Sequence, residues 1–332
     1  MKILFVTYSL QESFGVGSAR SRMLYKMLME KGHSITLVAD ENYTCVNILK
    51  SLIMDRYDVV YFSGPPFTYY LVSLLFGKIF NTGMLIVDFR DPWSFHIQGG
   101  YGKREKNNNL KLKLAIGIEK LIYKSCDKFV VCTTGMYRKY TELFKENKKL
   151  VVVYNGHEIE DSYLLCRHFA EKNKSIIRII CCGSFAYTGP TMANRLLNKL
   201  KINNRKEIEL VFIGTDDETK TFFGNIKLDN VKIKFYERMN YQEVLQEISK
   251  SDVGILALRD EEFEYGTKVF DYIGLGLPIY NLFDRKNNFY KTFKKYIIDE
   301  LDDIPQIDPD FEMRFSRKKQ IEKIVHMMEN IL

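Results

Sequence analysis

The stretch that decides the fold is Ser251–Phe283, SDVGILALRDEEFEYGTKVFDYIGLGLPIYNLF. Two short apolar runs, Asp252–Leu258 and Pro278–Phe283, stand near its ends, and each predicts a strand buried on both faces, as in a parallel sheet. Between them the sequence predicts a helix, because Thr267 is a favourable N-cap, Lys268–Ile273 contain no helix breaker, and Gly276 and Pro278 end the helix. A strand, a helix and a second strand in this order predict a parallel α/β unit.

The expected start of this helix carries groups that suit a phosphorylated ligand. In a parallel α/β sheet it lies at the carboxyl end of the preceding strand, where ligands bind. The free backbone amides of Gly266, Thr267 and Lys268 would point outward with the positive end of the helix dipole, which suits a phosphate. Asp271 follows one turn later on the same face, where a carboxylate can accept hydrogen bonds from ribose hydroxyls. These residues predict a binding site for a nucleoside diphosphate.

The alternation of strand and helix extends along the whole chain. In the first half the expected strands are Lys2–Tyr8, Ser34–Ala39, Asp58–Ser63, Met84–Phe89, Lys128–Thr133 and Leu150–Tyr154. In the second half they are Arg178–Cys182, Glu209–Ile213, Val231–Tyr236, Asp252–Leu258 and Pro278–Leu282. Helical patterns between them include Ala19–Lys31, Leu110–Lys124, Thr191–Leu200 and Tyr241–Lys250. We therefore expect two similar α/β domains, over residues 1–157 and 158–314, followed by a final helical segment over 315–332.

Length, charge and cysteine content narrow the class of protein. The chain of 332 residues is long enough for two domains with separate cores. Its net charge of +7 suits an anionic ligand or an anionic membrane surface, and is too diffuse to indicate nucleic acid as a partner. The six cysteines show no metal-binding spacing, which is typical of reduced core residues in a cytoplasmic protein. The most apolar helical segment, Tyr69–Phe80, falls short of the roughly 20 residues that span a bilayer, so we expect any membrane contact to be peripheral.

Two strings of the second half resemble a known motif. They are Gly266-Thr267-Lys268-Val269-Phe270-Asp271-Tyr272 and Gly276-Leu277-Pro278-Ile279, and they are similar to the donor-site motif of family-4-like retaining glycosyltransferases. The resemblance implies the GT-B architecture, in which two Rossmann-like, doubly wound parallel-sheet domains face a cleft. It also implies that the last helix, Arg317–Ile331, crosses back to pack on the first domain.

The same resemblance implies roles for single residues. Asp271 takes the position that binds the ribose of a nucleotide sugar, and Lys268 with the helix amides takes that of the diphosphate. A second acid of the family pattern falls at Phe263 in this chain. The resemblance therefore leaves Glu262 or Glu264 as the acid that faces the sugar.

In the first half, the segment Asp88-Phe89-Arg90-Asp91-Pro92-Trp93 concentrates charge at the end of an expected strand. Such charges need partners. One interpretation is an internal ion pair that shapes a turn. The other is that Asp88 or Asp91 binds an acceptor hydroxyl and Trp93 offers an apolar face to a sugar ring. The segment resembles a D-x-R-D-P-W string of many bacterial members of the family, which favours an acceptor site with Asp88, Arg90 and Trp93, and a catalytic role for Asp91.

Two glycine-containing loops are further candidates. The loop after the first strand contains Gly15 and Gly17. It fits the dinucleotide fingerprint poorly, which disfavours a Rossmann dehydrogenase. The resemblance implies that this loop lines the cleft on the substrate side, and a flexible loop with turn-forming glycines is the alternative. The loop at Gly183 and Ser184 precedes a helix, where backbone amides can hold a phosphate. Family members place a basic residue shortly after this glycine, whereas here the next one is Arg195.

The segment Lys103–Lys113 is basic and becomes amphipathic from Leu110 onward. Most segments of this kind are solvated helix faces. The alternative is a surface that binds anionic lipid head groups, which an enzyme with a lipid-linked acceptor would need.

Together, the residues and the resemblance predict a glycosyltransferase. It would move a sugar, with retention of configuration, from a UDP-, GDP- or dTDP-sugar to a glycan or lipid-linked acceptor in bacterial surface polysaccharide synthesis. The resemblance implies that no metal or cofactor is required, and the expected location is the cytoplasm or the inner face of the membrane. Two alternatives remain: a sugar-nucleotide epimerase, and a catalytically degenerate binding subunit. The displaced acid at Phe263 and the missing basic residue after Gly183 favour the latter.

Overall fold

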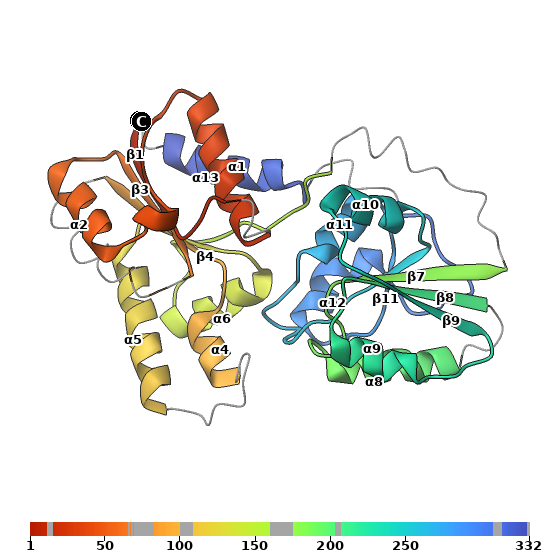
Figure 1. Cartoon of the computed structure of the whole chain (residues 1–332). Coiled ribbons are helices and arrows are strands. Elements are labelled where there is room, and N and C mark those ends of the chain that lie inside the picture. Colours follow the sequence, from red (N-terminus) through yellow and green to blue (C-terminus); the bar gives the residue numbers. More distant parts are fainter. Residues whose placement is uncertain are drawn as a thin grey trace. The chain divides into compact units, whose positions relative to one another are not determined.

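The computed structural model describes residues 1–11, 16–65, 67, 69, 83–99, 109–159, 175–202, 207–307 and 314–330 (Figure 1). The chain divides into two compact units. Unit 1 combines Met1–Asn155 with Arg317–Leu332, and unit 2 is Gly156–Ser316. Each unit contains one parallel sheet of six strands, with helices in the connections between them. The expected α/β class with two doubly wound parallel sheets is confirmed.

The sheet of unit 1 has the strand order β2-β1-β3-β4-β5-β6. Its strands are β1 (Lys2–Thr7), β2 (Ser34–Val38), β3 (Val59–Gly64), β4 (Met84–Phe89), β5 (Lys128–Val131) and β6 (Leu150–Val152). The helices of this unit are α1 (Val16–Glu30), α2 (Cys45–Met54), α4 (Trp93–Gly99), α5 (Asn109–Ser125), α6 (Thr134–Phe144) and α13 (Arg317–Glu329), with a 3-10 turn at Asp40–Asn42. Every strand expected from the apolar runs of the first half is present.

Helices cover both faces of this sheet. Ile3 and Phe5 of β1 pack in a core with residues of α1 and α13, whereas Leu4 and Val6 belong to a second core that includes residues of α2, α5 and α6. A central strand buried on both faces explains why its sequence is a continuous apolar run. The side chain of Gln320 in α13 accepts a hydrogen bond from the backbone N–H of Tyr154 at 3.0 Å, so the last helix is tied to the end of β6.

The sheet of unit 2 has the order β12-β11-β10-β7-β8-β9. Its strands are β7 (Ile176–Cys182), β8 (Glu207–Ile213), β9 (Val231–Tyr236), β10 (Val253–Ile255), β11 (Ile279–Tyr280) and β12 (Ile297–Ile298). Its helices are α8 (Pro190–Ile202), α9 (Asp217–Gly224), α10 (Tyr241–Ser249), α11 (Lys268–Gly274) and α12 (Asn288–Phe293), with a 3-10 turn at Lys294–Tyr296. Helices α8 and α9 lie on one face of the sheet, and α10 and α11 on the other (Figure 1).

Three strands differ most from the expectation. The strand expected over Pro278–Leu282 is limited to Ile279–Tyr280 in β11. The strand expected over Asp252–Leu258 is shorter, because the chain leaves the sheet after Ile255 and then turns. In that turn the carboxylate of Asp260 accepts hydrogen bonds from the backbone N–H groups of Glu262 and Phe263, at 2.8 and 3.3 Å. The edge strand β12 has only two residues, too few to produce an apolar pattern in the sequence.

A buried ion pair joins the elements of unit 1. The guanidinium of Arg20 in α1 donates to both carboxylate oxygens of Asp88 in β4, at 2.8 and 3.0 Å, and Tyr61 of β3 donates to the same carboxylate at 2.6 Å. Arg20 also donates to the carbonyl oxygens of Val153 and Tyr154, at 2.6 and 3.2 Å. Although burial alone would lower the pKa of Arg20, the charge of Asp88 raises it. The pair is therefore fully enclosed.

This pair generates a prediction about stability. Because Arg20→Met leaves the Asp88 charge buried without its counter-ion, we expect a loss of about 3–5 kcal/mol in the free energy of unfolding. The double variant Arg20→Met/Asp88→Asn should lose clearly less, since the uncompensated charge is gone. Urea unfolding measures both. As a control, Lys31→Met breaks the exposed ion pair between Lys31 and Glu329 and should cost no more than about 1 kcal/mol. A double variant that loses as much free energy of unfolding as Arg20→Met alone would contradict this account.

Candidate nucleotide site

Three turns with unusual backbone geometry lie at the carboxyl edge of the sheet of unit 2. Gly183, Gly214 and Gly266 follow β7, β8 and β10, and each has a positive φ, of 99°, 58° and 63°. Residues with side chains rarely adopt this conformation. Since β10, β7 and β8 are neighbours and run parallel, their carboxyl ends meet at one edge. This edge is where ligands bind in parallel α/β sheets.

Helix α11 begins at this edge, as the sequence predicts. Thr267 occupies the N-cap position, but its backbone is already helical, with φ of −92° and ψ of −26°, and its side chain makes no capping hydrogen bond. The expectation that the Thr267 side chain caps the helix is therefore wrong. A capping side chain needs an extended backbone at the N-cap, and the left-handed turn at Gly266 leads directly into helical geometry instead.

A tight contact positions α11 on the sheet. The hydroxyl of Tyr272 lies 3.3 and 3.1 Å from the carbonyl oxygens of Ile180 in β7 and Ile255 in β10, to which it donates. Its ring lies directly over Gly254, where a Cβ atom would be 2.6 Å from the Tyr272 ring. Burial raises the pKa of Tyr272 well above its ordinary value, so the hydroxyl remains a donor. These contacts fix the position of α11, and with it the position of its first turn, relative to β7 and β10.

Asp271 and Lys268 meet in this first turn. The Asp271 side chain is about 5% exposed; one carboxylate oxygen accepts from Lys268 Nζ at 3.1 Å, and the other accepts from the hydroxyl of Tyr241 at 2.8 Å. Lys268 Nζ also lies 5.4 Å from the centre of the Tyr241 ring. Burial raises the pKa of the Cys182 thiol to about 12, and the positive charge of Lys268 acts against this shift, which places Lys268 near the end of β7.

Tyr241 was not predicted from the sequence as a site residue. It is the first residue of α10, whose start is held by a capping box between Asn240 and Glu243. The capping box was a local signal for the helix start, but nothing nearby in the sequence indicates that a tyrosine there would reach a carboxylate 30 residues away.

The sequence predicts that backbone amides of the loop after β7 bind a phosphate, but in the structure N–H groups of this loop donate to a carboxylate of the protein. The carboxylate of Asp216, at the N-cap of α9, accepts hydrogen bonds from the hydroxyl of Ser184 at 2.7 Å and from the N–H of Phe185 at 2.7 Å. The N–H of Tyr187 donates to the same carboxylate at 3.3 Å. Burial would raise the pKa of Asp216, but these hydrogen bonds lower it. The expected phosphate-binding role of the loop at Gly183 and Ser184 is therefore weakened, because an internal carboxylate already binds these donors.

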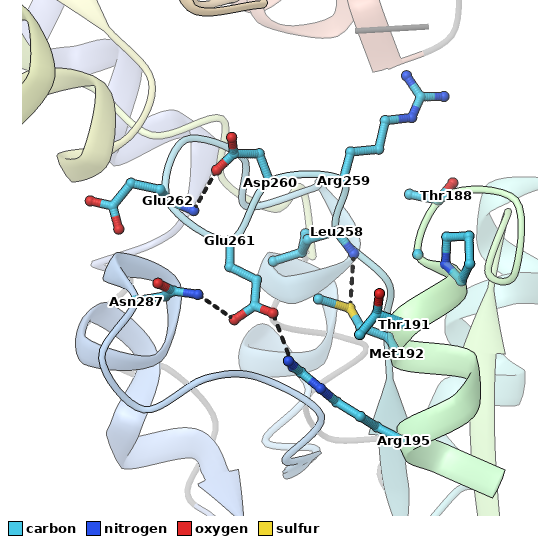
Figure 2. A pocket seen from close by; sticks show the side chains of 12 residues that line it. Thr188, Thr191, Met192, Arg195, Leu258, Arg259, Asp260, Glu261, Glu262 and Asn287 are labelled. Carbon is cyan, nitrogen blue, oxygen red and sulfur yellow. Dashed lines mark hydrogen bonds and ion pairs between the residues drawn. The ribbon is translucent and has the colours of Figure 1, made fainter. Parts of the chain in front are cut away.

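A cavity of about 360 Å³ lies beside the same edge, between the start of α8 and the loop after β10. Figure 2 shows its lining residues, which are Thr188, Gly189, Pro190, Thr191, Met192, Arg195, Leu258, Arg259, Asp260, Glu261, Glu262 and Asn287. Leu258 connects the cavity to α11, since a Cβ on Gly266 would be 3.7 Å from its Cδ2 atom. The cavity and the α11 start are therefore adjacent parts of one region.

The acidic residues of this loop have different surroundings. Glu261 accepts from Arg195 Nη1 at 3.1 Å and from Asn287 Nδ2 at 2.9 Å, so this acid, which the sequence did not single out, is the internal partner of Arg195 (Figure 2). Glu262 lines the cavity and accepts from the N–H of Asn288 at 3.1 Å. Glu264 is not among the lining residues. Arg259, also not predicted, extends away from the Glu261 cluster in Figure 2, and its guanidinium lies 5.8 Å from the Tyr187 ring centre.

The residues singled out in the first half lie in unit 1. Asp88 is fully buried in its pair with Arg20, so the internal ion pair replaces the expected acceptor contact. Arg90 donates to the carbonyl oxygen of Gly64 at 3.1 Å, and the Trp93 ring stacks on Phe67 with centres 5.2 Å apart. Asp91 lies between them in the chain and is partly exposed.

Of the two glycines expected in the loop after β1, the described residues include one. Gly15 lies outside the described residues, and Gly17 is the second residue of α1. Within the described ranges, no group of three or more His, Cys, Asp or Glu side chains is arranged to hold a metal ion.

Comparison with known proteins identifies the fold. The chain is similar to Anabaena HepE in complex with UDP-glucose, with a TM-score of 0.59 and 13% identity over 99% of this chain and 100% of that one. It is similar to sucrose-phosphate synthase from Thermosynechococcus elongatus, with a TM-score of 0.56 and 10% identity over 99% and 94% of the two chains. No family model and no curated protein matches the sequence. The chain has the GT-B fold, with two Rossmann-like domains.

The fit of Tyr272 over Gly254 generates a prediction. Gly254→Ala places a methyl group against the Tyr272 ring, and we expect it to lower the free energy of unfolding by about 1–3 kcal/mol. Gly117→Ala is the matched control, because nothing lies within 4 Å of its Cβ position in helix α5. It should stabilise the protein by roughly 0.5–1 kcal/mol, the helix preference of alanine over glycine. Denaturant unfolding that gives the same sign for both variants would contradict the proposed contact.

Proposed function

We propose that this protein is a glycosyltransferase that moves a sugar from a nucleoside diphosphate sugar to an acceptor hydroxyl. The observation that carries the proposal is the Asp271–Lys268 pair, which stands at the carboxyl edge of the second Rossmann-like sheet in a GT-B fold. The fold neighbours support it, since HepE is described in complex with UDP-glucose.

The chemistry of the pair suits the two ends of a nucleotide donor. A carboxylate such as Asp271 accepts hydrogen bonds from ribose hydroxyls, and the ammonium of Lys268 attracts the diphosphate. When the sugar leaves, negative charge develops on the diphosphate, and a fixed cation beside it lowers the barrier. Lys268, with the amides of Gly266 and Thr267, is our candidate for this role, because the loop after Gly183 has no basic residue before Arg195.

The adjacent cavity is our candidate for the sugar. Its volume of about 360 Å³ is within the range of small-molecule sites. Glu262 is the candidate acid within it, with Glu264 beside it in the chain. We assign the acceptor to unit 1, near Arg90, Asp91 and Trp93 at the carboxyl end of β4. Following the sequence resemblance, we propose a retaining reaction, with a glycan or lipid-linked acceptor of bacterial surface polysaccharide synthesis.

The test begins with binding. UDP, GDP and dTDP are each titrated into the wild type and Asp271→Ala, and unfolding is followed by thermal shift. A nucleotide at about a hundred times its dissociation constant should stabilise the wild type by about 2.7 kcal/mol. We expect one nucleotide to do so and Asp271→Ala to lose the effect. Asp229→Ala, which removes an exposed aspartate elsewhere in unit 2, is the control and should behave as the wild type. No stabilisation by any nucleotide would refute the proposed donor site.

Turnover then separates the enzyme from its alternatives. The sugar nucleotide of the base that binds is incubated with and without glycan acceptors. Transfer to an acceptor that Glu262→Gln slows supports the proposal. Conversion of the sugar to its epimer without any acceptor would indicate an epimerase, and tight binding without turnover would indicate a binding subunit.

Tyr241 generates a separate prediction about affinity. Its hydroxyl occupies an oxygen of Asp271 that a ribose would need, and its side chain is 40% exposed, so it can swing into solvent. Tyr241→Phe removes this competing hydrogen bond, which is worth about 1 kcal/mol, and should tighten nucleotide binding by about fivefold in calorimetric titration. Weaker binding would show instead that Tyr241 orients Asp271 for the ligand.

A further inference from the structure

Helix α5 exposes an apolar stripe to solvent. Leu110, Leu114 and Leu121 are 68%, 59% and 41% exposed. Their spacing of four and seven residues places them on one side of the helix. The buried residues Ala115, Glu119, Ile122 and Tyr123 occupy the opposite side. Helix α5 therefore packs on the core with one side and exposes three leucines to solvent on the other.

Hydrogen bonds to a buried acid fix the rotation of α5. Glu119 accepts from the hydroxyl and the N–H of Ser94 in α4, at 2.5 and 3.0 Å, and from the hydroxyl of Tyr140 in α6 at 2.8 Å. Burial raises the pKa of Glu119, although these hydrogen bonds act in the opposite direction. Because Glu119 joins α5 to both neighbouring helices, the leucines cannot turn inward without breaking this network.

Within helix α5, the exposed charges beside the leucine stripe are all positive. Lys113, Lys120 and Lys124 are exposed along one side of it, and Lys111 is exposed on the other. The single acid of α5 is the buried Glu119. A nucleic acid would satisfy the lysines and leave the leucines in water. An anionic bilayer satisfies both, because leucines enter the boundary of the acyl chains while lysines reach the phosphates.

We propose that the exposed face of α5, formed by Leu110, Leu114, Leu121, Lys113, Lys120 and Lys124, docks the protein on an anionic lipid bilayer. The helix lies in the plane of the interface. Among the described residues no helix is long and apolar enough to cross a membrane. Residues 103–108 of the basic segment Lys103–Lys113 lie outside the described residues, and the docking face begins at Leu110 and continues along α5. The proposal stands independently of the transferase activity.

The test is co-sedimentation of the full chain with vesicles of phosphatidylcholine alone or mixed with phosphatidylglycerol. We expect the wild type to bind only the anionic vesicles, more weakly as salt rises. Replacing Lys113, Lys120 and Lys124 with Gln should weaken binding about a hundredfold, at roughly fivefold per lysine. Replacing the three leucines with Ser should weaken it at least tenfold at every salt concentration. All six side chains are exposed, so the folded state should keep its thermal unfolding midpoint.

Matched controls separate this face from general charge and hydrophobicity. Lys201, Lys227 and Lys232 are exposed in unit 2, and their triple Gln variant removes the same charge. Val46, Ile53 and Met54 are 71%, 57% and 71% exposed on α2 or at its end, and their triple Ser variant removes similar apolar surface. Both controls should bind as the wild type does. The proposal is overturned if the wild type ignores anionic vesicles, if it binds neutral vesicles equally well, or if either control loses as much binding as its α5 counterpart.

Discussion

The candidate nucleotide site depends on the contact between Tyr272 and Gly254. The ring can approach β10 this closely only because Gly254 has no side chain, and the hydroxyl then reaches carbonyl oxygens of both β10 and β7. At the far end of the helix, Gly274 is equally confined, since a Cβ there would be 2.7 Å from Ile159. Helix α11 has only seven residues, so few side chains pack it against the sheet. The close approaches at Gly254 and Gly274 fix its position instead. Because Asp271 and Lys268 belong to α11, these contacts also fix their positions at the edge of the sheet.

The two units use charged residues at strand ends in different ways. In unit 1, Asp88 at the end of β4 turns inward and becomes the counter-ion of Arg20, so its charge stabilises the joining of α1, β3 and β4. In unit 2, Asp271 is nearly as well buried, but its partners are a lysine and a half-exposed tyrosine at the edge of the sheet. A ligand can exchange with a tyrosine that reaches solvent, whereas it cannot exchange with an enclosed arginine. Accessibility of the partners, more than burial of the acid, separates a structural carboxylate from a candidate binding one.

In the loop after β7, a carboxylate of the protein itself accepts the hydrogen bonds that a bound phosphate would otherwise accept. Asp216 supplies the negative charge from within the protein and takes the hydrogen bonds of Ser184 and Phe185. A positive charge beside the end of β7 comes instead from another element, since the charge of Lys268 acts on the Cys182 thiol there.

The sequence by itself determined the class of fold, because buried strands and amphipathic helices produce patterns over a few neighbouring residues. It also placed Asp271 and Lys268 together, since residues three apart share a helix face. Only the tertiary structure decided that Asp88 pairs with Arg20, 68 residues away, that Tyr241 reaches Asp271, and that Glu261 holds Arg195. It also decided which side of α5 faces water. These contacts follow from the order of strands in the sheets, and a parallel sheet brings distant segments to one edge through crossovers that leave no local pattern in the sequence.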